Sequence, residues 1–224
     1  MQQTKFTIEV TNSHHSQYAD TILSEIASSA AARGTGIAKR SKVYILRKIN
    51  MGNAVIALTK QGEWAGFCYI EVWDHEKYVV NSGLIIKPDY RKAGLAKEVK
   101  EAIFKLSRKK YPKAKIFGLT TGPAVMKINS SLGYAPVAYA DLTKDETFWK
   151  GCQSCVNFEI LKSKNYENCL CTAMLYTPKN VKKLEQKALR ADFKDNIPLF
   201  ERWVKVKKAV LLKFKKAAKA TKLF

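Results

Sequence analysis

Residues Asn81–Lys97 read N-S-G-L-I-I-K-P-D-Y-R-K-A-G-L-A-K. The first part is β-rich, and Pro88 ends the strand because proline cannot donate to a sheet ladder. Gly94 and Ala96 remove side chains from the turn that opens the next helix, so backbone N–H groups can approach an anion. The unpaired donors and positive dipole of a helix N-terminus favour a pyrophosphate there, with Arg91 as a charged partner. The pattern predicts a strand, a phosphate-binding loop and a helix, although a plain strand–turn–helix joint is the alternative.

This loop resembles that of the GNAT-superfamily N-acyltransferases, in which Val or Ile two residues before Pro leads into R/Q-x-x-G-x-G/A. A second family block, a short strand and a helix that ends in L-G-F or L-G-Y, is matched by residues 115–134, which end in Leu132-Gly133-Tyr134. The resemblance covers about Phe6–Pro136. It implies acetyl-CoA or another acyl-CoA as co-substrate, bound by Leu84, Ile85, Ile86, Arg91, Lys92, Ala93, Gly94, Leu95 and Ala96.

The order of the expected elements indicates an α/β fold. Hairpin strands come first and strands separated by helices follow, which predicts a mixed, mostly antiparallel GNAT-like sheet flanked by helices. We expect an acyltransferase domain at 1–140, a Cys-containing extension at 141–178 and a basic helical tail at 179–224. The predicted strands are Lys5–Val10, Ala54–Leu58, Trp64–Trp73, Val79–Lys87 and Lys115–Leu119, and the predicted helices are Ser16–Arg33, Ser41–Asn50, Lys97–Arg108 and Ala124–Ser131.

The composition is that of a folded protein, with 46% hydrophobic residues among 224. The N-terminal residues are polar, and no run approaches the ~20 apolar residues that a membrane span needs. We therefore expect a cytoplasmic protein without a membrane span. The sequence leaves the oligomeric state open.

The net charge of +21 is concentrated near the end of the chain, where residues 179–224 hold 15 Lys or Arg against 4 Asp or Glu. Apolar residues recur there at helical spacing, from Leu199 through Trp203 to Phe214. Such a helix could dock on the catalytic domain, lie on an anionic membrane or track a nucleic-acid backbone. Docking is favoured, and nucleic-acid binding is the lesser option because Trp203 and Phe214 of the stripe are too few for a base-stacking platform.

Two residues are candidates for the chemistry of acyl transfer to an amine. Glu71 lies among aromatic residues on the expected strand Trp64–Trp73, and in GNAT relatives a Glu on the equivalent strand often serves as the base. A carboxylate that faces water at the strand end is the alternative. Many relatives place a Tyr, as general acid for the thiolate, where this sequence has Asn129.

The amide of Asn129 can hydrogen-bond the sulfur or the pantetheine but cannot supply a proton at neutral pH. Water, Tyr134 or Tyr139 could protonate the thiolate instead, or the fold could bind acyl-CoA with weak chemistry. Asn129 as an ordinary residue at the helix C-terminus is an equally good interpretation.

The loop between the first two expected helices carries Arg33, Lys39 and Arg40. In relatives this region commonly builds the acceptor side of the cleft. The three cations could clamp a carboxylate, which would favour an amino acid or another acidic amine as acceptor. A solvated basic loop is the alternative.

Four cysteines cluster beyond the resemblance. Cys152 and Cys155 form a C-x-x-C pair, and Cys169 and Cys171 form a C-x-C pair after thirteen intervening residues. Four thiolates could bind Zn²⁺, although the second spacing is shorter than usual. Buried thiols or a redox pair are the alternatives.

Together these patterns predict an N-acyltransferase that moves an acetyl or other short acyl group from acyl-CoA to a small-molecule amine, by direct attack in a ternary complex. The alternative function is a non-catalytic acyl-CoA-binding or regulatory module whose basic tail contacts a partner or nucleic acid. Asn129 in place of Tyr keeps that alternative open.

Overall fold

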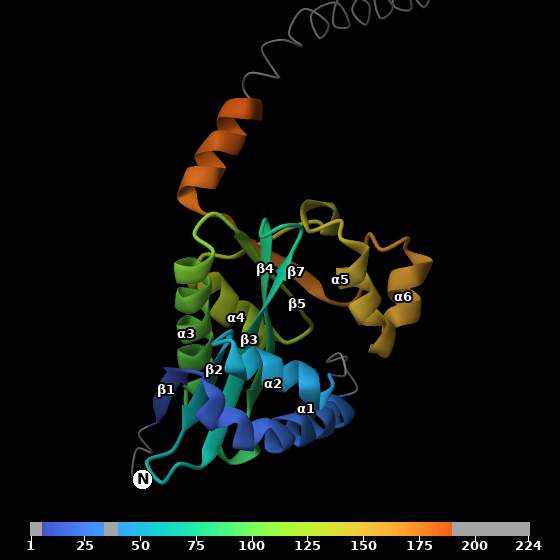
Figure 1. Ribbon diagram of the computed structural model, residues 1–224. Coiled ribbons are helices and arrows are strands. Elements are labelled where there is room, and N and C mark those ends of the chain that lie inside the picture. The colour runs from blue at the N-terminus through green and yellow to red at the C-terminus, as the bar shows by residue number, and fades with distance from the viewer. Residues whose placement is uncertain (1–5, 34–39, 190–224) are drawn as a thin grey trace, which may run out of the picture. The chain divides into compact units, whose positions relative to one another are not determined.

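The computed structural model describes residues 6–33 and 40–189 (Figure 1). The chain divides into the units Met1–Pro178 and Lys179–Phe224, and of the second unit the described residues 179–189 are helical. The expected apolar stripe of the tail, from Leu199 to Phe214, lies outside the described residues. No helix in the described part of the chain is long and apolar enough to cross a membrane.

The first unit is built around one mixed sheet of seven strands, in the order β1-β2-β3-β4-β5-β7-β6. All neighbours are antiparallel except β4 and β5, which are parallel. This confirms the predicted mixed, mostly antiparallel α/β class. The strands are β1 (Thr7–Val10), β2 (Ala54–Leu58), β3 (Trp64–Trp73), β4 (Tyr78–Ile86), β5 (Lys115–Thr120), β6 (Ala135–Pro136) and β7 (Thr172–Tyr176).

Helices pack on both faces of the sheet, and short helical turns join several of the elements. The α-helices are α1 (Ala19–Arg33), α2 (Lys42–Asn50), α3 (Leu95–Lys110), α4 (Pro123–Ser131), α5 (Glu146–Lys150) and α6 (Phe158–Ser163); the 3-10 turns are η1 (Ser13–Tyr18), η2 (Pro88–Tyr90), η3 (Tyr139–Asp141) and η4 (Gly151–Ser154).

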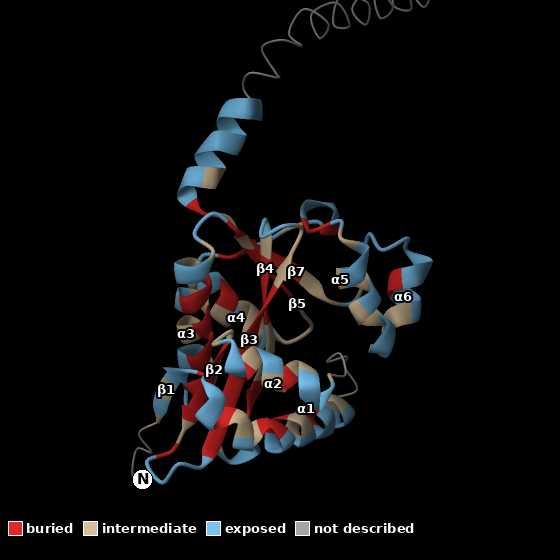
Figure 2. Ribbon diagram, in the orientation of Figure 1, coloured by how far each residue is buried: buried red, intermediate tan, exposed pale blue. Residues whose placement is uncertain are grey.

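Strand β3 shows how the two faces are separated, because successive side chains on a strand point to opposite sides. Phe67 and Tyr69 pack in one buried cluster with residues of α1 and α2, whereas Cys68 and Ile70 pack in another with Val99 and other residues of α3. Figure 2 shows the buried residues running along the central strands and the inner sides of the helices. The sheet therefore has α1 and α2 on one face and α3 on the other.

Strands β4 and β5 pair over only three residues of each, Tyr78–Val80 with Lys115–Phe117. The remainder of β4 has no registered partner on β5, so the two strands separate and open the middle of the sheet. A bulge in β4 lies beside this opening, because Phe67 pairs with Ile85 whereas Tyr69 pairs with Ser82. The opening and the bulge are the features of the fold that shape the site.

Residues 137–171 form a cover segment between β6 and β7, with η3, α5, η4 and α6 (Figure 1). Its apolar side chains share a buried cluster with residues of the sheet, among them Leu161 of the cover segment with Phe117 and Leu175. The region expected as an extension at 141–178 is thus continuous with the sheet, since β7 inserts between β5 and β6.

Candidate functional site

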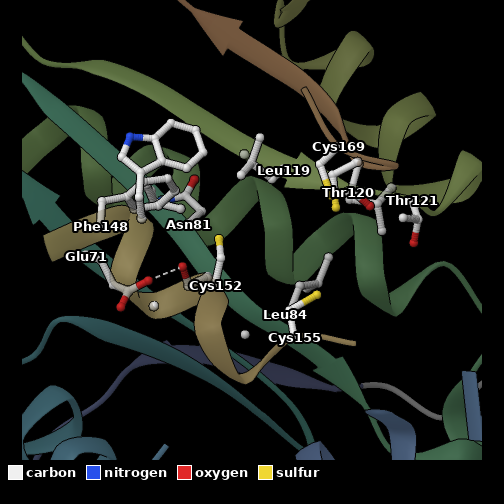
Figure 3. Close-up of a pocket in the computed structure, with 18 of the residues that line it drawn as sticks. Glu71, Asn81, Leu84, Leu119, Thr120, Thr121, Phe148, Cys152, Cys155 and Cys169 are labelled. Carbon is white, nitrogen blue, oxygen red and sulfur yellow. Dashed lines mark hydrogen bonds between the residues drawn. The ribbon is translucent and has the colours of Figure 1, made fainter. Parts of the chain in front are cut away.

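A cavity of about 720 Å³ occupies the opening between β4 and β5 (Figure 3). Side chains of both separated strands line it, together with residues of α2 and β3, and the cover segment contributes aromatic and thiol groups. Lys100 of α3 and Asn129 of α4 line it from the other face of the sheet. In Figure 3, Glu71 and Phe148 lie toward one end of the cavity, and Thr120, Thr121 and Cys169 toward the other.

The Glu71 carboxylate is the most constrained group of the cavity, and its residue is only 4% exposed. It accepts hydrogen bonds from Arg40 Nη2 at 3.1 Å, from the Tyr44 hydroxyl and from the Ser82 hydroxyl. The expected alternative, a strand-end carboxylate that faces water, is therefore wrong. The aromatic strand did not predict the polar neighbours of the carboxylate, which are Arg40 before α2, Tyr44 of α2 and Ser82 of β4.

The groups around Glu71 are held in defined protonation states. Burial and the Glu71 charge raise the pKa of Tyr44, and burial with the same charge raises the pKa of Tyr69. Burial opposes the charge of Arg40, but Tyr69 and Glu71 raise the pKa of its guanidinium. Tyr44 therefore remains a neutral donor to Glu71, the neutral Tyr69 hydroxyl accepts from Arg40, and Arg40 remains a cation. A carboxylate has about four lone-pair sites, so three bonds leave one on Oε2 for a ligand.

The predicted carboxylate clamp is only partly described. Arg40 donates from Nε to the Tyr69 hydroxyl at 2.9 Å and pairs with Glu71, so its guanidinium is already engaged by the site. Arg33 ends α1, but its side chain and Lys39 lie outside the described residues. Arg40 thus positions Glu71 in this structure, and a clamp by Arg33 and Lys39 stays a prediction.

The predicted phosphate-binding loop is an exposed turn at the N-terminus of α3. Gly94 has φ +86° and occupies the N-cap without any side-chain hydrogen bond, and Lys92 has φ +65°. A lysine in this left-handed region is uncommon, and such strain is frequent at ligand-binding turns. Leu95 anchors the helix in the core. The first N–H groups of α3 therefore have no intrahelical acceptor, as an anion site requires.

Arg91 makes contacts that the loop motif did not predict, and its bond to a phosphate stays a prediction. Its Nη2 donates to Glu25 Oε1 at 2.7 Å and to Ser29 Oγ at 2.9 Å, and its Nε donates to the Ile86 carbonyl at 2.9 Å. These bonds tie the loop to α1 and to the end of β4. Arg91 thus fixes the loop, and the backbone N–H groups and the exposed Lys92 and Ala93 remain for a phosphate.

The β4 residues expected to contact acyl-CoA face different ways. Leu84 lines the cavity, whereas Ile85 and Ile86 point into the cores on opposite faces of the sheet. Because this part of β4 has no registered partner on β5, its backbone groups on that edge are open to a ligand. A ligand with amide groups, as pantetheine has, can pair with such an edge like an added strand.

Asn129 is 1% exposed and lines the cavity. Its Nδ2 contacts Met174 Sδ at 3.8 Å, and its Oδ1 has no hydrogen-bond partner within the described part of the chain. Of the alternative acids, Tyr134 donates to Asn81 Oδ1 at 3.3 Å and Tyr139 to the Cys171 carbonyl at 2.8 Å. Burial raises the pKa of both phenols, which makes them weaker acids.

The structure does not support the predicted zinc site. Cys152, Cys155, Cys169 and Cys171 all line the cavity as free thiols, but no group of three or more His, Cys, Asp or Glu that could hold a metal occurs among residues 6–33 and 40–189. Burial, followed by the effect of the neighbouring cysteines, raises the pKa of Cys152 to about 11 and of Cys171 to about 12.

Sequence reasoning missed several residues of the cavity. Tyr44, Ser82 and Lys100 had no motif to mark them, since each becomes relevant only when α2, β4 and α3 meet. One signal was available for Lys100. It lies beside Val99 and Ile103 on the apolar side of α3, where a lysine is unusual.

Comparison with known proteins identifies the fold alone. No family model matches the chain, and no curated protein matches its sequence. Solved structures do match. N-acetylglutamate synthase from Neisseria gonorrhoeae, complexed with coenzyme A and N-acetyl-glutamate, has a TM-score of 0.55 at 13% identity; the match covers 79% of this chain but 36% of that one.

Two shorter proteins match over most of their own length. A GNAT-family acetyltransferase from Staphylococcus aureus has a TM-score of 0.54 at 11% identity over 78% of this chain and 100% of that one. A GNAT-superfamily phosphinothricin acetyltransferase from Sinorhizobium meliloti, in complex with AcCoA, has a TM-score of 0.52 at 14% identity over 79% of this chain and 89% of that one. About four fifths of the chain therefore has the fold of the GNAT acetyltransferases.

Proposed function

We propose that this protein is an acyl-CoA-dependent N-acyltransferase that moves an acetyl or other short acyl group to the amine of a small molecule. One observation carries the proposal: the buried carboxylate of Glu71 is hydrogen-bonded to Ser82 beside the β4 bulge, inside a cavity that opens between β4 and β5. A base beside an open strand edge is what amine acylation by a bound thioester requires.

The donor binds with its phosphates at the N-terminus of α3 and its pantetheine along the open edge of β4, from Ile86 to Leu84. Its thioester then reaches Ser82 and Gly83, where the bulge turns the backbone toward the cavity. Backbone N–H groups that a bulge leaves unpaired can stabilise the oxyanion that develops during attack.

Glu71 binds the acceptor as an ammonium through the unused site on Oε2 and takes its proton. The neutral amine attacks the thioester carbonyl directly, and the tetrahedral intermediate collapses to the amide and CoA. The raised pKa values of Cys152 and Cys171 support a direct attack over an acyl-cysteine intermediate, because neutral thiols are poor nucleophiles.

The cover segment makes the acceptor end of the cavity aromatic. Tyr139, Phe148, Trp149 and Phe158 line it, and the buried Nε1 of Trp73 has no hydrogen-bond partner among the described residues. We infer an acceptor with an apolar or aromatic body beside its amine. For an amino acid such as phenylalanine or tryptophan, the carboxylate would be met by Arg33 and Lys39.

The test is CoA release from acetyl-CoA with and without an amine. The panel comprises 2-phenylethylamine, tryptamine, phenylalanine, tryptophan, glutamate and spermidine. We expect the aromatic amines or aromatic amino acids to stimulate release, and glutamate and spermidine to have little effect. If the protein binds CoA by calorimetry but no amine stimulates release, the enzyme proposal fails and the non-catalytic acyl-CoA-binding module becomes the better account.

A further inference from the structure

Lys100 of α3 places an amine on the wall of the cavity. The residue is 2% exposed, its Nζ lies 3.5 Å from the carbonyl oxygen of Asn81, and it lies 5.6 Å from the ring centroid of Tyr134. An ammonium has three N–H donors, and among the described residues Lys100 donates this single, long hydrogen bond. The amine therefore has hydrogen-bonding capacity to spare on the wall of the cavity.

No carboxylate pairs with this lysine among residues 6–33 and 40–189. The titratable groups that face it are the Cys68 thiol from β3 and the Tyr134 phenol from the turn after α4. Lysine is rarely buried without a partner, because an unpaired ammonium loses its hydration. An anion that forms transiently in the cavity would supply the missing partner.

Glu71 and Lys100 lie on opposite faces of the sheet. Glu71 contacts Arg40 and Tyr44 on the face that carries α1 and α2, whereas Lys100 comes from α3 on the other face. The opening between β4 and β5 connects the two faces, so both residues line one cavity. Consecutive β4 residues mark the two sides, since Ser82 bonds Glu71 and Asn81 contacts Lys100.

This arrangement suits a reaction in which one group loses a proton and another gains one. With the donor laid along β4 from Leu84 toward Asn81, its thioester lies between the carboxylate and the amine; Glu71, Asn81 and Leu84 all border the pocket in Figure 3. The attacking amine is on the side of Glu71. The sulfur is then left on the side of Lys100, where Asn129 cannot supply a proton.

We propose that Lys100 is the general acid that protonates the departing CoA thiolate, an assignment that rests on the proposed function. When the tetrahedral intermediate collapses, the C–S bond breaks and its electron pair moves to sulfur. A proton passes from the Lys100 ammonium to the sulfur, which gives CoA thiol and a neutral lysine. As the intermediate collapses, the nitrogen of the new amide gives its second proton to water. After CoA leaves, water restores the proton to Lys100, and Glu71 returns the acceptor's first proton to solvent.

The environment of Lys100 suits this role in two ways. Burial lowers the pKa of its ammonium, which makes it a stronger acid than an exposed lysine. Burial raises the pKa of the neighbouring Cys68 thiol to about 11, so Cys68 stays neutral and does not take the proton. With Lys100 as the acid, protonation of the CoA thiolate needs neither Tyr134 nor Tyr139.

The experiment compares two acetyl donors in the presence of the best amine of the panel above. Acetyl-CoA releases an alkyl thiolate that benefits from protonation, whereas S-acetyl-4-nitrothiophenol releases a stabilised thiolate that leaves without a proton. We expect Lys100→Met to lower kcat with acetyl-CoA by about 10²- to 10⁴-fold. With the nitrothiophenol donor its kcat/KM should match that of the wild type.

Lys105→Met is the matched control, because Lys105 is an exposed lysine on the same helix. It should behave as the wild type with both donors. CoA affinity measured by calorimetry should be equal in Lys100→Met and wild type, which shows that the variant is folded. A lysine with a purely structural role would slow both donors equally, and that result would overturn the assignment.

The Lys100 assignment can also be tested on the wild type alone, so that the test does not depend on the folding of a variant. The ratio of the rates with acetyl-CoA and with the nitrothiophenol donor cancels the titration of the acceptor amine. This ratio should fall as the pH rises and Lys100 loses its proton, at a pH below the ~10.4 of an ordinary lysine. A ratio that does not change with pH overturns the Lys100 assignment while the proposed function stands. A wild type that no amine stimulates refutes both.

Discussion

Gly83→Ala tests whether the β4 bulge shapes the site. Gly83 has φ +63°, and a Cβ at this position would lie 2.3 Å from Tyr69 Cε1 and 2.9 Å from its Cδ1. An L-residue in the left-handed region costs about 1–2 kcal/mol. The overlap must also be relieved, and Tyr69 can move only by loosening its bond to Arg40 and its packing on Tyr44.

Overpacking of this kind costs about 1–3 kcal/mol, so we expect Gly83→Ala to lower the free energy of unfolding by about 2–5 kcal/mol. Gly62→Ala is the matched control. Gly62 has φ +79° but no atom within 4 Å of an added Cβ, so that variant should lose only about 1–2 kcal/mol.

Urea unfolding of the two variants and the wild type measures both losses, with equal m-values as the check on two-state behaviour. Because Tyr69 holds the Arg40–Glu71 pair, Gly83→Ala should also slow the acceptor-dependent release of CoA, whereas Gly62→Ala should not. A loss of stability no larger in Gly83→Ala than in Gly62→Ala would refute the close approach of Gly83 to Tyr69.

Arg91→Ala should weaken CoA binding by about tenfold, because the loop loses its hydrogen bonds to α1. The control Lys113→Ala, at an exposed lysine, should bind CoA like the wild type. Equal CoA affinities of Arg91→Ala and the wild type in calorimetry would contradict the positioning role of Arg91. Dialysis against a chelator should leave the thermal midpoint unchanged, and a drop of several degrees with release of zinc would restore a metal site. Lys100→Met should be more stable than wild type at pH 7, because the wild type buries an unpaired charge. Burial lowers the pKa of Lys100 in the folded state, so between that pKa and the pKa of the unfolded chain the unfolded chain binds more protons. The free energy of unfolding of the wild type therefore rises with pH. Urea unfolding should show a smaller stability difference between Lys100→Met and the wild type at pH 10 than at pH 7.

The central strands could be predicted because their signals are local. Ala54–Leu58 and Trp64–Trp73 are apolar runs separated by a glycine turn, and both have the predicted bounds in the structure. The helix after the phosphate loop begins at Leu95, two residues before the predicted start, because Gly94 adopts the left-handed N-cap conformation. Strand β7 was missed, since its partner β5 is more than fifty residues earlier in the chain and no local pattern records that pairing.

Site residues could be predicted where they lie on a recognisable motif or strand. Contacts between elements that are distant in the sequence could not be predicted, and these contacts decide the chemistry of the site. Glu71 could be singled out from its strand, but the donors that surround it come from Arg40 before α2, from α2 and from β4. Arg91 could be found from the loop motif, but its partner Glu25 lies 66 residues away on α1. Lys100 lies in a lysine-rich helix, and only packing distinguishes it from its exposed neighbours.

The most direct test of the central claim is acceptor-dependent CoA release by Glu71→Gln. The amide keeps the shape of the side chain and still accepts from Arg40, but it cannot take a proton from an amine. We predict a loss in kcat of about 10²- to 10⁴-fold at neutral pH with unchanged affinity for CoA, and wild-type turnover in the exposed control Glu76→Gln. Turnover by Glu71→Gln equal to that of the wild type would remove Glu71 from the mechanism and contradict the account of the site.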